Sequence, residues 1–135
     1  MKNYTYNMRG MDYLIVNLSL PSENRKGITE KKKIVNRRVK SLQVLNLSGV
    51  RLSTSTYVIR KSDFSKLKGL NLKVLGTPFK SVIIDAIKER VKSILGRTYK
   101  KETWKRKIKI LKHLNAFYYE LTGEPLEELK EFFGD

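Results

Sequence analysis

Four lysines in the second half of the chain are spaced as neighbours on one face of a helix. They follow one another at intervals of four, four and three residues, and they are Lys101, Lys105, Lys109 and Lys112. Like charges at this helical spacing repel one another. Phosphates bound along the row would turn that repulsion into attraction through the release of counterions. This row, the lysine face, therefore predicts binding of a nucleic-acid backbone.

The lysine face is part of a longer basic stretch, and the chain contains a second such stretch. The first basic cluster consists of Lys31, Lys32, Lys33, Arg37, Arg38 and Lys40. The second basic cluster consists of Arg97, Lys100, Lys101, Lys105, Arg106, Lys107, Lys109 and Lys112, with Glu102 as the opposing charge. A solvated helix face is the alternative interpretation. Such a face normally interleaves acids with its bases, and their scarcity here favours a polyanionic ligand.

The charge of the chain is unevenly distributed. The 135 residues include 29 Lys and Arg against 13 Asp and Glu, a formal charge of +16. Residues 120–135 hold six acids and one lysine, a net charge of −5, so the preceding residues carry +21. A polycationic body of this kind repels itself unless a polyanion relieves the repulsion. The charge pattern therefore predicts a nucleic acid as the partner, which the aromatic residues below narrow to single-stranded DNA (or RNA).

Aromatic side chains near these bases could stack on unpaired bases. Tyr99 lies within the second basic cluster and is the first candidate. Tyr57 is the second, because Ser53 and Ser55 would share its face of a strand and predict that this face is exposed. Trp104 is expected to be a core residue, because it shares a helical stripe with Ile108 and Leu111.

The sequence contains few residues for catalysis. There is no Cys and His113 is the single His, which excludes thiolate chemistry and any site that needs two histidines. The sequence contains neither G-x-x-x-x-G-K-S/T nor G-x-G-x-x-G, the glycine motifs that hold nucleotide phosphates. No cofactor is predicted. Asp12, Glu23 and Glu30 could serve a metal-dependent nuclease, although their spacing matches no known motif. We expect a protein without enzymatic activity and keep the nuclease as an alternative.

The end of the chain combines acids with aromatic residues. We divide the sequence into a basic nucleic-acid-binding domain, residues 1–123, and an acidic-aromatic tail, residues 124–135. Phe132 and Phe133 would anchor a protein partner, because buried aromatics dominate such contacts. As a separate arm, the tail would be dispensable for folding. The alternative is a last helix that packs on the core through Leu126, Leu129 and Phe132.

Hydrophobic periodicity predicts the elements that position these residues. Strands are predicted at 13–20, 50–60 and 70–74, and a short helical turn at 62–69. A helix should begin at a Thr29 cap, place Val35, Val39, Leu42 and Leu45 on its buried face, and end before Gly49. A second helix should begin at Thr77-Pro78 and end at Gly96, and a third should cover 101–121.

These elements predict an α+β fold. A small sheet of three or four strands would be packed by two to three helices, and the fold would be ferredoxin-like in part. A fourth strand would have to come from Tyr4-Thr5-Tyr6. An exposed edge of such a sheet favours a homodimer.

The apolar runs are too short to cross a bilayer, and the first residues lack the apolar stretch of a signal peptide. We therefore expect no membrane contact and a cytoplasmic protein. Abundant Lys, Ile and Tyr with a single Gln are compatible with a thermophilic source.

One known family shares the small size, basic charge, element order and acidic-aromatic end of this chain. The chain resembles the single-stranded-DNA-binding proteins of archaeal rod-shaped viruses that lack an OB fold. This resemblance implies a dimer in the host cytoplasm, with a basic groove for single-stranded DNA and a tail that contacts partners. Our prediction is a sequence-independent single-stranded-DNA-binding protein. An RNA-binding or structural nucleoprotein component and the nuclease are its alternatives.

Overall fold

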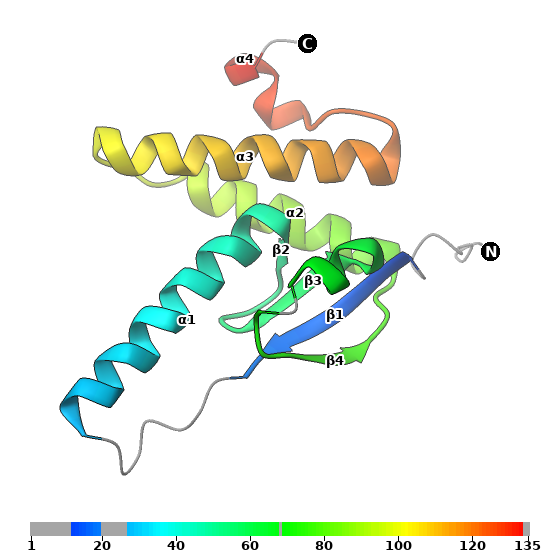
Figure 1. Cartoon of the computed structure of the whole chain (residues 1–135). Coiled ribbons are helices and arrows are strands. Elements are labelled where there is room, and N and C mark those ends of the chain that lie inside the picture. The colour runs from blue at the N-terminus through cyan, green and yellow to red at the C-terminus, as the bar shows by residue number, and fades with distance from the viewer. Residues whose placement is uncertain (1–11, 20–26, 68, 134–135) are drawn as a thin grey trace. The chain divides into compact units, whose positions relative to one another are not determined.

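The computed structural model describes residues 12–19, 27–67 and 69–133, without the side chains of residues 132 and 133. The chain divides into two compact units, and the division falls between Thr77 and Pro78. Asp12–Thr77 form the sheet unit, and the residues from Pro78 onward form the helical unit (Figure 1). The boundary predicted at residue 123 falls within the helical unit and stays a prediction.

The sheet unit contains four strands in the order β2-β3-β1-β4, and every neighbouring pair is antiparallel. Its elements along the chain are β1 (Tyr13–Leu18), α1 (Ile28–Ser48), β2 (Gly49–Arg51), β3 (Thr56–Arg60), the 3-10 helix η2 (Lys61–Leu67) and β4 (Leu72–Gly76). The strands that α1 connects are separated by β3, which is the split β-α-β arrangement of ferredoxin-like sheets. The predicted α+β class is confirmed, with η2 in the place of the second helix.

One core cluster of the sheet unit lies on one face of the sheet. Side chains two residues apart on a strand point to the same face, so Val16 and Leu18 of β1 lie beside Tyr57 and Ile59 of β3. Leu45, near the end of α1, packs into the same cluster. The N-terminal half of α1 extends past the sheet (Figure 1), which leaves the first basic cluster in solvent.

Helix α1 differs from the prediction in its start and in part of its buried face. It begins at Ile28 after Gly27, so Thr29 lies in the first turn and is not its cap. Of the predicted row, Leu45 is buried and Leu42 packs against the core, whereas Val35 and Val39 are exposed. Ile34 and Ser41 are buried in their place.

The strand predicted at 50–60 is a hairpin of two strands. The backbone N–H groups of Leu52 and Ser53 both donate to the carbonyl oxygen of Thr56, at 2.8 and 3.2 Å, and close a turn. The turn was hidden in the sequence because Ser and Thr suit both a strand and a turn. β2 is thus the fourth strand, and the segment Tyr4-Thr5-Tyr6 lies outside the described residues.

Gly49 allows this hairpin to close tightly. It pairs with Ile59, and a Cβ atom at residue 49 would collide with the carbonyl oxygen of Val58. We expect Gly49→Ala to lower the free energy of unfolding by about 1–3 kcal/mol, the usual cost of overpacking. Gly69→Ala is the control, because a Cβ there would meet open space. Equal losses for both variants in urea unfolding would contradict the close approach.

The edge strand β4 is irregular. Ile15 pairs with Gly76 and Val16 with Val74, so Leu75 has no partner on β1 and forms a bulge. Bulges at an edge discourage pairing with another chain. The structure therefore gives no support at β4 to a dimer built by strand pairing, and the homodimer stays a prediction.

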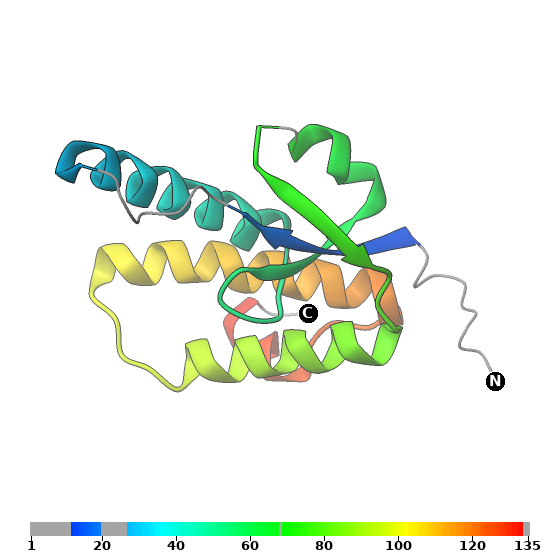
Figure 2. The same cartoon turned by 90° about the horizontal axis from the view of Figure 1, so that it is seen from below.

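The helical unit consists of α2 (Lys80–Leu95), α3 (Lys101–Thr122), the 3-10 helix η3 (Glu127–Leu129) and the short α4 (Lys130–Phe133). α2 and α3 pack against each other, as both views show (Figure 2). α2 buries Ile83, Ile87, Val91 and Ile94, and α3 buries Ile110, Leu111, Leu114, Phe117 and Leu121. One face of each helix thus forms the core of this unit.

The predicted ends of α2 and α3 are nearly all confirmed. α3 begins at Lys101 as predicted, and Gly123 follows it with a left-handed φ of 79°, which favours glycine. Helix α2 begins only at Lys80, because Phe79 occupies the N-cap position expected for Thr77.

The segment after Gly123 is packed on the helical unit. Leu126 and Leu129 are each 1% exposed, and the N–H of Leu126 donates to Oδ1 of Asn115 on α3 at 2.7 Å. Figure 2 shows this segment alongside α2 and α3. Leu126 and Leu129 are thus buried as the last-helix interpretation predicts, and whether the segment is dispensable for folding stays a prediction.

Candidate nucleic-acid interface

The lysine face lies on the solvent side of α3. All four of its lysines are exposed, whereas Ile110, Leu114 and Phe117 are buried on the other side of the helix. Each residue advances about 1.5 Å along a helix, so the face is about 16 Å long. Within the described part of the chain, the side chains of Lys101, Lys105 and Lys109 have no hydrogen bond or ion pair. Their charges are therefore available to a ligand.

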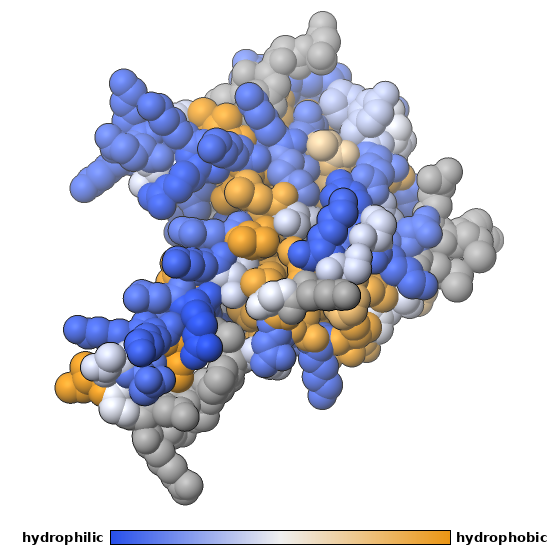
Figure 3. Space-filling view, in the orientation of Figure 1, coloured by the Kyte–Doolittle hydropathy of each residue, from blue (hydrophilic) through white to orange (hydrophobic). Residues whose placement is uncertain are grey.

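Other members of the second basic cluster surround this face. Arg97 and Lys100 are exposed just before α3. Arg106 is exposed on the flank, where its Nη2 donates to Oγ1 of Thr103 at 3.5 Å. Lys107 is half-buried, and its Nζ lies 5.3 Å from the centre of the Tyr99 ring. Figure 3 shows hydrophilic side chains gathered over the N-terminal half of α3.

Tyr99 has partners inside the helical unit. Its ring stacks on Trp104 with centroids 6.1 Å apart and planes 17° apart, and both residues are half-buried. With Lys107 also against the ring, Tyr99 offers less open surface than we predicted. Leu111 of the predicted core stripe is fully buried, whereas Trp104 and Ile108 are half-buried.

Tyr57 does not belong to an interface. Its side chain is 1% exposed in the core of the sheet unit, and its hydroxyl donates to Oδ1 of Asn46 at 3.2 Å. The prediction that Tyr57 stacks on bases is wrong. Ser53 and Ser55, whose polarity predicted an exposed face, lie in the hairpin turn before β3 rather than on the strand.

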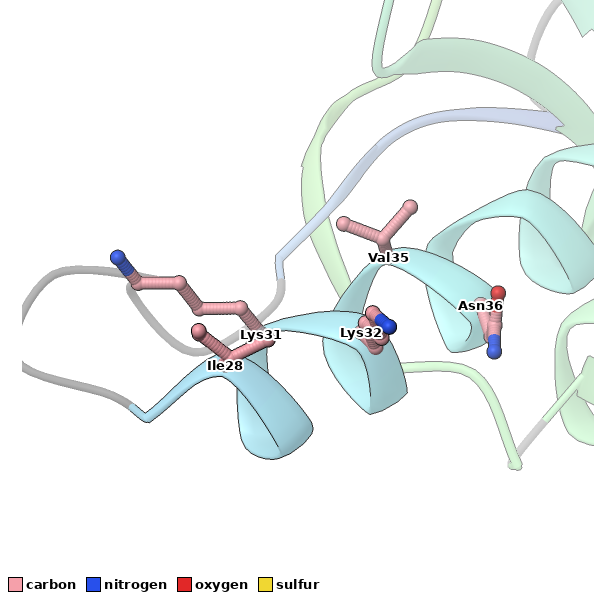
Figure 4. A pocket seen from close by; sticks show the side chains of 5 residues that line it. All are labelled: Ile28, Lys31, Lys32, Val35 and Asn36. Carbon is pink, nitrogen blue, oxygen red and sulfur yellow. The ribbon is translucent and has the colours of Figure 1, made fainter.

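The first basic cluster lies on the N-terminal half of α1. Lys31, Lys32, Lys33, Arg37 and Lys40 are exposed. Ile28, Lys31, Lys32, Val35 and Asn36 line a shallow hollow, in which Lys31 points away from the helix (Figure 4). Lys33 pairs with Glu30 at 3.8 Å between two exposed side chains, which is a weak interaction in water.

Arg38 is the exception in this cluster. It is half-buried, and its Nη2 donates to Oγ of Ser55 in the hairpin turn. Arg38 therefore connects α1 to the sheet, and the prediction that it holds phosphate is not supported by its position. The first basic cluster belongs to the sheet unit and the second to the helical unit.

The described residues offer little for catalysis. No three side chains of His, Cys, Asp and Glu among them lie close enough to hold a metal ion. Asp12 and Glu30 are exposed, and Glu23 lies outside the described residues. His113 is half-buried and packs edge-on against Phe117, with ring centres 5.7 Å apart. The described residues therefore give no support to the nuclease alternative.

The proposed partner contacts of the tail are not described. The backbone of Phe132 and Phe133 belongs to α4, but their side chains lie outside the described residues. Their role in partner binding stays a prediction.

One exposed aromatic residue on α3 was not among the predicted site residues. Tyr119 is 58% exposed and follows Lys112 by seven residues, or two helical turns, so it lies on the same side of the helix. The spacing was visible in the sequence. Tyr119 was overlooked because it lies beyond the basic stretch, next to Glu120.

Comparison with protein-family models, with curated proteins and with solved structures found no match. No helix in the described ranges has both the length and the apolar character needed to cross a bilayer.

Proposed function

We propose that this chain binds single-stranded DNA through its phosphates, without sequence preference and without catalysis. The observation that supports this most is the lysine face, a row of exposed lysines on α3. Its members Lys101, Lys105 and Lys109 have no acidic partner among the described residues.

The row of like charges destabilises α3, and a bound polyanion would remove this destabilisation. Each pair of like charges one turn apart destabilises a helix by a few tenths of a kcal/mol. Each phosphate held by a lysine releases counterions from the nucleic acid, which favours binding. A row meant only for solubility would be more stable with acids interleaved.

The residue types favour binding without sequence preference. Lysine ammonium groups are compact point charges that contact phosphate, and phosphate contacts carry no sequence information. The resemblance to the viral single-stranded-DNA-binding proteins implies the same ligand. A protein of this kind would act in the cytoplasm, that of the host if the chain is viral.

A binding experiment tests the proposal against its alternatives. Gel shifts would compare single-stranded DNA, duplex DNA and RNA of one sequence, each with and without Mg²⁺. We expect the tightest binding to single-stranded DNA and no cleavage. Preference for RNA would support the nucleoprotein alternative, and Mg²⁺-dependent cleavage would support the nuclease. No binding to any of the three would contradict the proposal.

Salt dependence provides a quantitative prediction. For single strands, the slope of log K against log salt is about −0.7 per phosphate contact, so four to six contacts give roughly −3 to −4. Fluorescence titrations of a labelled oligonucleotide at several salt concentrations would measure this slope. A slope near zero would show that the basic residues do not contact phosphate.

A further inference from the structure

Tyr119 is the aromatic residue best placed to meet a ligand on the lysine face. Among the described aromatic side chains, Phe64, Phe79 and Tyr119 are exposed. Phe64 lies on η2 in the sheet unit and Phe79 at the start of α2. Tyr119 alone of these three lies on α3, and it lies in line with the lysines. Tyr57 is buried and Tyr99 is partly covered, so the two predicted platforms are less available.

The charges along α3 differ between its two ends. The N-terminal half carries the lysines and the positive end of the helix dipole, and both attract phosphate. The C-terminal end carries the negative end of the dipole together with Glu120 and Glu124, which are exposed. A phosphate is therefore disfavoured beside Tyr119, whereas an uncharged base is not. About 10 Å of helix separates Tyr119 from Lys112.

We propose that Tyr119 is a platform on which one base stacks, at the end of a backbone held by the lysine face. This inference rests on the proposed function and specifies it, because the face of a base is open to stacking in a single strand but not within a duplex. The backbone at Tyr119 is fixed by the end of α3, since the N–H of Gly123 donates to its carbonyl oxygen at 2.7 Å. Stacking accepts every base, so it agrees with binding without sequence preference.

The experiment measures affinity and salt slope with two probes, a short oligothymidylate and the same strand made of abasic nucleotides. On oligothymidylate, Tyr119→Ala should weaken binding roughly 5- to 150-fold, the range for one stacked base. The salt slope should not change, because no phosphate contact is lost. Tyr119→Phe should retain affinity. On the abasic strand, the wild-type chain and Tyr119→Ala should bind equally.

Phe64→Ala is the matched control, because it removes an exposed aromatic of the sheet unit and leaves α3 unchanged. The thermal midpoint of each variant shows that the fold is intact. If oligothymidylate binds and Tyr119→Ala has no effect, the platform is refuted and the proposed function stands. If Tyr119→Ala weakens both probes equally, the residue contacts the backbone and the inference is wrong. If the wild-type chain binds neither probe, the proposed function itself fails.

Discussion

Truncation of the chain after Gly123 is expected to unfold the helical unit. The deletion removes Leu126 and Leu129, each buried to 1% exposure, and the N–H that Asn115 accepts at 2.7 Å. Deleting a buried leucine side chain costs about 2–5 kcal/mol, so the two together cost about 4–10 kcal/mol. The total stability of a protein is of the same order, about 5–15 kcal/mol. Urea unfolding of the truncated chain would measure the loss.

Point variants separate this effect from the loss of tail charge. Leu126→Ala and Leu129→Ala should each lower the free energy of unfolding by about 2–5 kcal/mol. Glu128→Gln is the control, because that exposed side chain should change stability by less than about 0.5 kcal/mol. A truncated chain as stable as the full chain would show that the tail is a separate arm.

The elements were predictable where one periodicity dominates the sequence. α3 was located nearly to the residue, because its apolar positions recur at helical spacing between Lys101 and Gly123. The hairpin was missed because Ser53 and Ser55 also fit an alternating strand. Of the apolar row predicted on α1, Leu42 and Leu45 pack on the core of the sheet unit. Val35 and Val39 are exposed because the neighbouring Ile34 is buried in their place.

The candidate site, too, was predictable from the sequence only in part. The exposure of the lysine face follows from helical geometry, so the sequence was sufficient to predict it. The positions of Tyr57, Arg38 and Tyr99 depend on contacts with Asn46, Ser55 and Trp104 respectively. Apart from Tyr99 and Trp104, these pairs are distant in the sequence, and no local pattern indicates them.

Loss of three lysines should abolish most of the binding. The change is Lys101→Gln, Lys105→Gln and Lys109→Gln in one chain. Glutamine keeps a long side chain and a similar helix propensity, and all three positions are exposed, so the fold should be unaffected. Each phosphate contact contributes about 0.7 to the salt slope, so the slope should fall by about 2 and the affinity at 0.1 M salt roughly 100-fold.

A control with the same loss of charge shows whether position matters. Lys61→Gln, Lys73→Gln and Lys92→Gln remove three exposed lysines outside both basic clusters. If phosphates contact the lysine face, this control should keep nearly the full salt slope, because it leaves all four lysines of that face in place. Equal losses in both triple variants would mean that net charge alone drives binding. Full binding by the first variant would exclude α3. The same substitution of Lys32, Arg37 and Lys40 would then test the first basic cluster, whose exposed bases on α1 offer the other phosphate surface.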